Sequence, residues 1–157
     1  MQNLMPVILL LLFSLPTFGQ KAEVFGGYQL THFNGGPSNG WIAALTGNFL
    51  PFHGVTADFS GVYNSGTHVY TYTFGPEVHA HALGVKPFAH ALFGGGTFSG
   101  GGVNSTGFTT YLGGGVDVNV LPFISVRFTQ VDWMTTRFSG VTDKNHVRIS
   151  AGLVLRF

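Results

Sequence analysis

Three residues that could bind a metal ion occur at two-residue intervals: Glu77, His79 and His81. On a β-strand they would share one face, and a carboxylate with two imidazoles could coordinate Zn²⁺ or Ni²⁺. A straight strand, however, places successive residues of one face about 6.5 to 7 Å apart, too far for all three to hold one ion. We therefore expect no metal site and no cofactor, and we interpret these residues as part of an internal hydrogen-bond network.

Nucleophilic catalysis is the other chemistry that the residues could support. The chain has no Cys, which excludes a thiol nucleophile, a zinc–thiolate site and a disulfide framework. His146 and Ser150 fall on one face of an alternating segment, and they could contribute to a hydrolytic triad because such a triad depends only on geometry. We keep this arrangement as an alternative and predict that the protein is not an enzyme.

The elements that must position these residues are β-strands. Beyond Gln20, Gly recurs every few residues, and strand-forming Val, Phe, Tyr and Thr dominate between the breaks. The C-terminal segment alternates clearly, with one face made of Val147, Ile149, Ala151, Leu153, Leu155 and Phe157. Similar patterns upstream predict eight strands in all. In the segment 124–138 the alternation holds only if a β-bulge shifts the register near Thr129, and we predict that bulge.

The connections between these segments differ in character. Those at 51–54, 82–85 and 121–123 are tight, whereas those at 34–39, 64–67, 99–106 and 139–144 are polar and rich in Gly, Ser and Asn. Short turns at one end and longer loops at the other are typical of transmembrane barrels. We predict an all-β, eight-stranded antiparallel up-and-down transmembrane β-barrel over residues 20–157, with the polar loops outside.

The charge content decides between a membrane barrel and a soluble one. Only 8% of residues are charged, mean hydropathy is +0.30, and after residue 20 no apolar run is long enough for a membrane helix. A soluble lipocalin-like barrel would carry its charges outside. Here the opposite face is almost free of charge, so we expect a luminal network, paired within itself and with Lys86 or Arg156, that comprises Glu23, Asp58, Glu77, Asp117, Arg127 and Arg148.

Two further features concern the membrane. Aromatic residues near the loop-side strand ends predict an interfacial girdle made of Trp41, Tyr63, Tyr70, Trp133 and Phe138. The segment from Pro6 to Pro16, PVILLLLFSLP, has the length of a signal-peptide core. We therefore expect residues 1–19 to be a signal peptide for the Sec pathway, cleaved after Gly19. The net charge of +1 gives no reason to expect nucleic acid as a partner.

The signal segment, the VRISAGLVLRF ending and the motifs FGGYQL, FGPEVHAH and PFAHALFGGG resemble those of the small outer-membrane β-barrel proteins of Gram-negative bacteria, of the OmpA/OmpX type. The resemblance implies a location in the cell outer membrane, with lipid around the barrel. It also implies that the barrel assembly machinery recognises the last strand through Leu153, Leu155 and Phe157. Some barrels of this size are lipid A deacylases, but none of the seven His residues has the Ser two positions on that those enzymes carry.

We predict a monomeric, non-enzymatic outer-membrane barrel with a packed polar lumen and a structural, envelope-integrity or surface-interaction role. The main alternative is a narrow porin-like channel, in which the luminal charges line a path for ions or small solutes. A lipid-modifying barrel enzyme and a soluble lipocalin-like carrier remain as further alternatives.

Overall fold

The computed structural model describes residues 21–33, 36–64, 66–138 and 141–157. The expected signal peptide, residues 1–19, lies outside the described residues. The described chain forms eight strands: β1 (Lys21–Phe33), β2 (Gly36–Leu50), β3 (His53–Asn64), β4 (Thr67–His79), β5 (Val85–Gly100), β6 (Val103–Leu121), β7 (Ile124–Phe138) and β8 (Val141–Arg156). Within these ranges, no helix is long and apolar enough to cross a bilayer.

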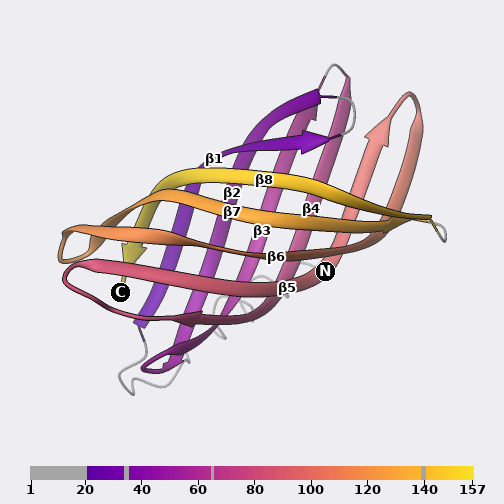
Figure 1. Cartoon of the computed structure of the whole chain (residues 1–157). Helices are drawn as coiled ribbons and strands as arrows, with labels where there is room; N and C mark the ends of the chain where they lie inside the picture. The colour runs from indigo at the N-terminus through magenta and orange to yellow at the C-terminus, as the bar shows by residue number, and fades with distance from the viewer. Residues whose placement is uncertain (1–20, 34–35, 65, 139–140) are drawn as a thin grey trace, which may run out of the picture.

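The strands form one closed barrel in chain order, and every neighbouring pair is antiparallel (Figure 1). The first and last strands close it, through pairs that run from Glu23 with Arg156 to His32 with Val147. Closure leaves no long sheet edge along the wall, so backbone groups within the barrel are paired with a neighbouring strand. The predicted fold class is confirmed.

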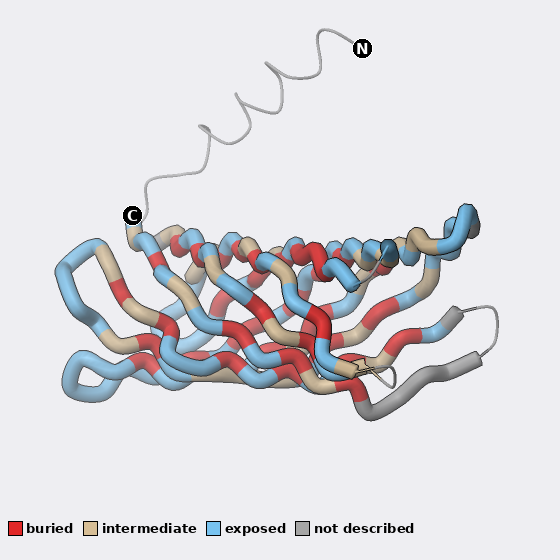
Figure 2. Tube along the Cα trace, turned by 90° about the horizontal axis from the view of Figure 1, so that it is seen from above, coloured by how far each residue is buried: buried red, intermediate tan, exposed pale blue. Residues whose placement is uncertain are grey.

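Each strand has an inner and an outer face. In β4 the side chain of Thr73 is buried whereas its neighbour Phe74 is 67% exposed, and this alternation continues along the strand. Figure 2 shows the same interchange of buried and exposed residues around the barrel. The inner face carries all the described carboxylates and most of the buried polar residues, whereas most of the large apolar residues lie on the outer face. This is the reverse of a soluble barrel.

The predicted bulge in β7 is confirmed. Arg127 pairs with Asp117 of β6, and the next paired residue of β7 is Thr129, so Phe128 is the extra residue on that side. Phe128 and Thr129 are both exposed, whereas Arg127 and Gln130 on either side are buried. The bulge therefore restores the inward direction for the polar residues that follow it.

The expected difference in connection length is wrong. Most of the polar residues assigned to outer loops belong to the strands: β5 and β6 pair as far as Gly100 with Val103, leaving a two-residue turn. Gly101 and Gly102 have φ values of 59° and 79°, which suit the tight turn of a hairpin and which only Gly adopts without strain. The longest connection lies at the other end, over residues 80–84 between β4 and β5. Uncharged Ser, Thr and Asn residues can continue strand pairing in water, so their polarity did not mark loops.

Candidate functional site

The candidate site is the lumen, where all the predicted network residues lie. Glu23, Asp58, Glu77, Asp117, Arg127 and Arg148 are each at most 4% exposed. They come from strands around the barrel, and the structure joins them into three groups along its axis. From the end with the turns 51–52, 80–84 and 122–123, called here the turn side, these groups centre on Lys86, Arg127 and Arg148.

The first group surrounds Lys86, whose ammonium is fully buried. Its Nζ donates to both carboxylate oxygens of Glu23 at 2.8 Å and lies 3.8 Å from Oε1 of Glu77. Glu77 also accepts a hydrogen bond of 2.8 Å from Thr56. Arg156 reaches Glu23 at 3.2 Å from the turn-side end of β8. Two carboxylates and two cations thus neutralise one another where burial of a single charge would be costly.

The second group holds Arg127 between two aromatic rings. Its Nε and Nη2 donate to the carboxylate of Asp117 at 2.6 and 3.1 Å, and its Nη1 donates to Gln130 at 2.7 Å. The guanidinium carbon lies 4.3 Å from the centre of the Phe25 ring and 4.1 Å from that of Phe88. The Arg127 guanidinium thus combines three hydrogen bonds with contacts to two aromatic rings.

The third group centres on Arg148, which is fully buried. Arg148 donates to both oxygens of Asp58 at 3.0 and 2.8 Å and to Asp132 at 2.9 and 2.5 Å. Its guanidinium carbon lies 3.9 Å from the ring centre of Tyr111. His90 contacts the other oxygen of Asp132 at 2.6 Å. Gln130 joins this group to the second, because it also donates to Asp132 at 2.7 Å.

The expectation of an entirely polar lumen needs correction. Leu92, Tyr111 and Met134 form a buried apolar cluster with Phe33 packed against it. A second cluster, Phe25, Ile42, Ala44 and Val154, lies on the inner faces of β1, β2 and β8. Large apolar side chains fill space between the ion pairs and give the arginines ring faces to stack on. Ion pairs and apolar clusters thus share the interior of the eight-stranded barrel.

Sequence reasoning missed several residues of this network. Asp132, His90, Gln130 and Tyr111 were not among the predicted luminal set, although each is at most 4% exposed and bonded to it. The predicted bulge could have identified Gln130 and Asp132 as luminal, because a register shift before them turns both side chains inward. His90 shares an inner face with Lys86, which alternation in β5 indicated.

The two catalytic or metal-binding alternatives find no supporting geometry. His79 lies 3.9 Å from Glu77, and its ring centre is 5.2 Å from that of His81, which follows the end of β4. Among the described residues, no group of three or more side chains could hold a metal ion. His146 and Ser150 are both buried, but they lie four positions apart along β8, about 13 Å, with Arg148 between them.

A cavity of about 530 Å³ opens at the turn side. Its polar lining consists of Glu23, Asn48, His79, His81, Asn119 and Arg156, and apolar turn residues surround these. Arg156 and Asn119 are hydrogen-bonded to each other there. The lining residues all belong to strand ends, turns or their immediate neighbours, so the cavity ends where the Lys86 group begins.

The outer wall carries an apolar band of the height that lipid requires. The band covers ten residues of β2, from Trp41 to Leu50, and ten residues of β7, from Ile124 to Trp133. A tilted membrane strand needs about 9–11 residues to cross the hydrocarbon. The turn-side edge of the band consists of exposed apolar residues that sequence reasoning did not assign to a girdle: Phe49, Leu50, Phe52, Phe123 and Phe157.

The predicted loop-side girdle residues lie on the outer wall, so far as their side chains are described. Trp41, Tyr63, Tyr70 and Trp133 are between 40% and 55% exposed. Three of them form a connected group on β2, β3 and β4. The Trp41 indole donates to the Tyr63 hydroxyl at 3.1 Å, and the Tyr70 hydroxyl donates to the same Tyr63 hydroxyl at 3.5 Å. The side chain of Phe138, the fifth predicted member, lies outside the described part.

Comparison with solved structures decides the fold type. Neisserial surface protein A superposes with a TM-score of 0.67 at 15% identity, over 89% of this chain and 98% of that one. This chain has the fold of the small outer-membrane β-barrels. The N-terminal β-barrel domain of Pseudomonas aeruginosa OprF is similarly close, with a TM-score of 0.64, 12% identity and coverage of 88% and 97%.

A third small outer-membrane barrel, Ail, the attachment invasion locus protein of Yersinia pestis, gives a TM-score of 0.55 at 16% identity, over 89% of this chain and all of that one. No family model and no curated protein matches the sequence. At these identities the likeness establishes the small outer-membrane barrel fold and not a shared activity.

Proposed function

We propose that the protein is an integral outer-membrane β-barrel with a closed lumen, which serves a structural, envelope-integrity or surface-interaction role and neither transports solutes nor catalyses a reaction. One observation carries the proposal: Arg127 is bonded to Asp117 and lies close to the rings of both Phe25 and Phe88. These side chains come from β1, β5, β6 and β7, so together they reach across the lumen. An ion would have to displace a buried salt bridge and two rings to pass.

The membrane location rests on the outer face. Exposed Phe, Leu, Val, Trp and Tyr cover a band about ten residues tall, and the solved proteins of similar fold are outer-membrane barrels. Export through the Sec pathway, cleavage after Gly19 and a monomeric state belong to the same proposal. So does the role of Leu153, Leu155 and Phe157 as an assembly signal, because all three lie on the lipid-facing side of the last strand.

The competing function is a narrow porin-like channel, and planar-bilayer recording separates the two. We expect the folded wild-type protein to give no steady unitary currents. The double variant Phe88→Ala and Arg127→Ala removes only the middle group, and we expect it to give no steady currents either, because the Arg148 group still spans the lumen. Heat-modifiable mobility on a gel verifies that each variant is a folded barrel. Steady wild-type currents that disappear when Arg127 or Asp117 is replaced would show that the luminal charges line a path, and would overturn the closed-lumen proposal.

A further inference from the structure

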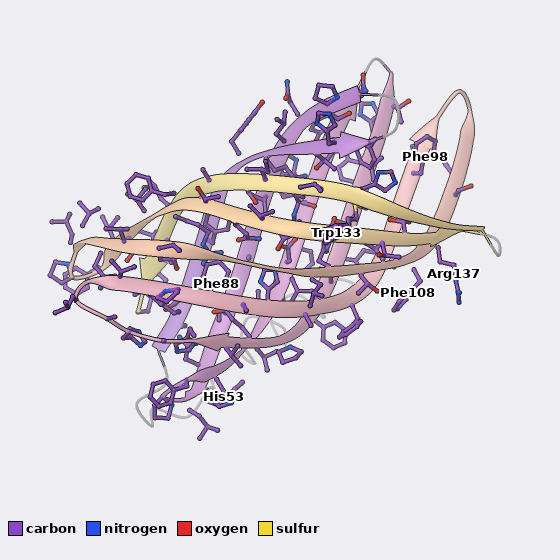
Figure 3. The ribbon with its side chains drawn as sticks, in the orientation of Figure 1. His53, Phe88, Phe98, Phe108, Trp133 and Arg137 are labelled. Carbon is purple, nitrogen blue, oxygen red and sulfur yellow. The ribbon has the colours of Figure 1, made fainter. Side chains whose placement is uncertain are left out.

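The cavity at the turn side has the size of a small-ligand site. Its volume of about 530 Å³ lies within the range that such sites occupy in folded proteins. The Lys86 group forms its floor, where Lys86 and Glu23 are bonded to each other at 2.8 Å. Figure 3 shows the turn side at His53 and the opposite, loop-side end at Phe108 and Arg137. A ligand can therefore enter this cavity from the turn side without passing through the barrel.

Three side chains that line the cavity carry a buried polar atom without a hydrogen-bond partner in the described part of the chain. Nη2 of Arg156 lies 4.0 Å from Asp117, and Nδ1 of His79 lies 3.9 Å from Glu77, which are both too far for a hydrogen bond. Oδ1 of Asn48 is the third such atom. A buried polar atom without a partner costs free energy, and a ligand that supplies the complementary group removes this cost.

The unpaired atoms of Arg156 and Asn48 require different groups on the ligand. A guanidinium nitrogen only donates hydrogen bonds, whereas an amide oxygen only accepts them. The ligand must therefore present both an acceptor and an N–H donor, which a peptide backbone does. Both side chains are partly exposed, so a change of rotamer can turn these atoms toward a ligand.

The charges beside Arg156 favour an uncharged acceptor over an anion. Nε of Arg156 donates to the carboxylate of Glu23 at 3.2 Å, and the carboxylate of Asp117 lies 4.0 Å from Nη2. A third carboxylate at the same guanidinium would be repelled by these two. A peptide carbonyl carries no net charge, so it can accept a hydrogen bond from Nη2 without this repulsion.

Apolar residues surround the polar part of the cavity. They belong to the turns 51–52 and 122–123 or to the strand ends beside these turns, and they are Phe49, Leu50, Pro51, Pro122, Phe123 and Phe157. Such a surface gains free energy when it covers aliphatic or aromatic side chains. Polar atoms that need a donor and an acceptor, with an apolar surface around them, together match a short peptide segment that has apolar side chains.

We propose that the turn-side cavity binds a short, uncharged peptide segment with apolar side chains. A backbone carbonyl of this segment accepts a hydrogen bond from Arg156, and a backbone N–H donates to Asn48. The inference rests on the proposed function, which closes the lumen beneath the cavity, and it gives the surface-interaction role a place and a ligand class. The partner is a protein on the turn side that presents such a segment.

Titration with a blocked peptide tests the proposal. N-acetyl-Leu-Ala-Leu-amide is added to the folded barrel in nanodiscs, and amide NMR shifts measure its affinity. We expect saturable shifts at turn-side residues only. Asn48→Ala should weaken binding about fivefold, the factor for one hydrogen bond. Arg156→Lys keeps the positive charge beside Glu23 but removes Nη2, and it should weaken binding about tenfold. Asn64→Ala is the matched control, because it removes an Asn bonded to Ser38 far from the cavity, and it should bind as the wild type does.

Heat-modifiable mobility verifies that each variant is a folded barrel. Absence of saturable shifts in the wild type, or wild-type affinity in folded Asn48→Ala or Arg156→Lys, would overturn the proposal and leave the closed lumen intact. Equal or tighter binding of the free acid N-acetyl-Leu-Ala-Leu would assign the cavity to anions and overturn it. Displacement of the peptide by lysophosphatidylcholine would assign the cavity to acyl chains, with the same consequence. Steady currents through the wild type would instead refute the closed lumen itself.

Discussion

Arg148 and Asp58, ninety residues apart in the chain, form two hydrogen bonds of 3.0 and 2.8 Å inside the barrel. They belong to β8 and β3, which are not neighbours, so the pair braces opposite parts of the wall across the lumen. The same guanidinium also bonds to Asp132 of β7. One side chain therefore holds three strands together.

Removal of this cation should be strongly destabilising. Arg148→Met removes the cation that two buried carboxylates share, leaving Asp132 with only His90 and Gln130 as partners. We expect the free energy of unfolding to fall by about 3–5 kcal/mol. Urea unfolding in detergent, followed by tryptophan fluorescence, measures the change. Arg137→Met is the matched control, because it removes an exposed arginine and should stay within about 0.5 kcal/mol of wild type under the same conditions. Equal unfolding midpoints for both variants would contradict the bracing role.

Two adjacent glycines in β5 should respond differently to the same small change. A Cβ on inward-facing Gly94 would collide with the backbone of β4, at the Tyr72 carbonyl and 2.7 Å from Cα of Thr73. For a Cβ on outward-facing Gly95 the nearest atoms would all belong to the Tyr72 side chain, which can move. We expect Gly94→Ala to cost about 1–3 kcal/mol of unfolding free energy and Gly95→Ala clearly less. The reverse order, measured by urea unfolding, would refute this account of close strand approach.

The bulge in β7 should be required for folding. Deletion of Thr129 removes the register shift, so either Arg127 or the pair Gln130 and Asp132 must turn toward lipid, where a charge costs about 2–4 kcal/mol at mid-depth. We expect the deletion variant to lose heat-modifiable mobility. Thr129→Ala keeps the residue count and changes only an exposed side chain, so it should fold as wild type does. A folded deletion variant would mean that the network tolerates the reversed register.

Phe157 should matter for assembly more than for stability. The residue is 74% exposed, and its backbone N–H donates to the Ala22 carbonyl at 2.9 Å, a bond that Phe157→Ala preserves. We expect this variant to insert more slowly into vesicles that contain the assembly machinery, and to insert at the wild-type rate by unassisted folding into short-chain lipid. Comparable slowing in both assays would point to a general folding defect instead of recognition.

The strands and their faces were predictable because alternation reports burial directly. In the last strand, apolar residues occupy every second position from Val147 to Phe157, and the positions between them are mostly polar or small. Around Thr129 this two-residue alternation is interrupted, and the interruption located the bulge. Connection lengths were not predictable, since Ser and Asn in 99–106 can belong to a turn or to strands that extend into water. The structure extends both strands there.

The site was predictable in composition but not in pairing. Asp58 and Arg148 fall on the polar face of their alternating strands, and this placed them in the lumen. Which cation meets which carboxylate, however, depends on the tilt and stagger of the strands in the barrel. The contact of Arg127 with the rings of Phe25 and Phe88 could not be predicted either. A Phe in an alternating strand is assigned to the lipid-facing side unless the register of its strand is known. The absence of Cys from the sequence offers a way to test these faces one residue at a time.

The central claim is that the apolar outer face lies in lipid and the lumen is closed. Single-cysteine variants at Phe74 and Phe93, which pair in register on the outer face, and at Thr73, which faces inward, test it in vesicles. With an environment-sensitive fluorophore attached, positions 74 and 93 should be quenched by brominated acyl chains, whereas the buried thiol at position 73 should not react with the label in the folded barrel. Labelling of positions 74 and 93 by a water-soluble maleimide in intact vesicles, without quenching by the lipid, would contradict the claim.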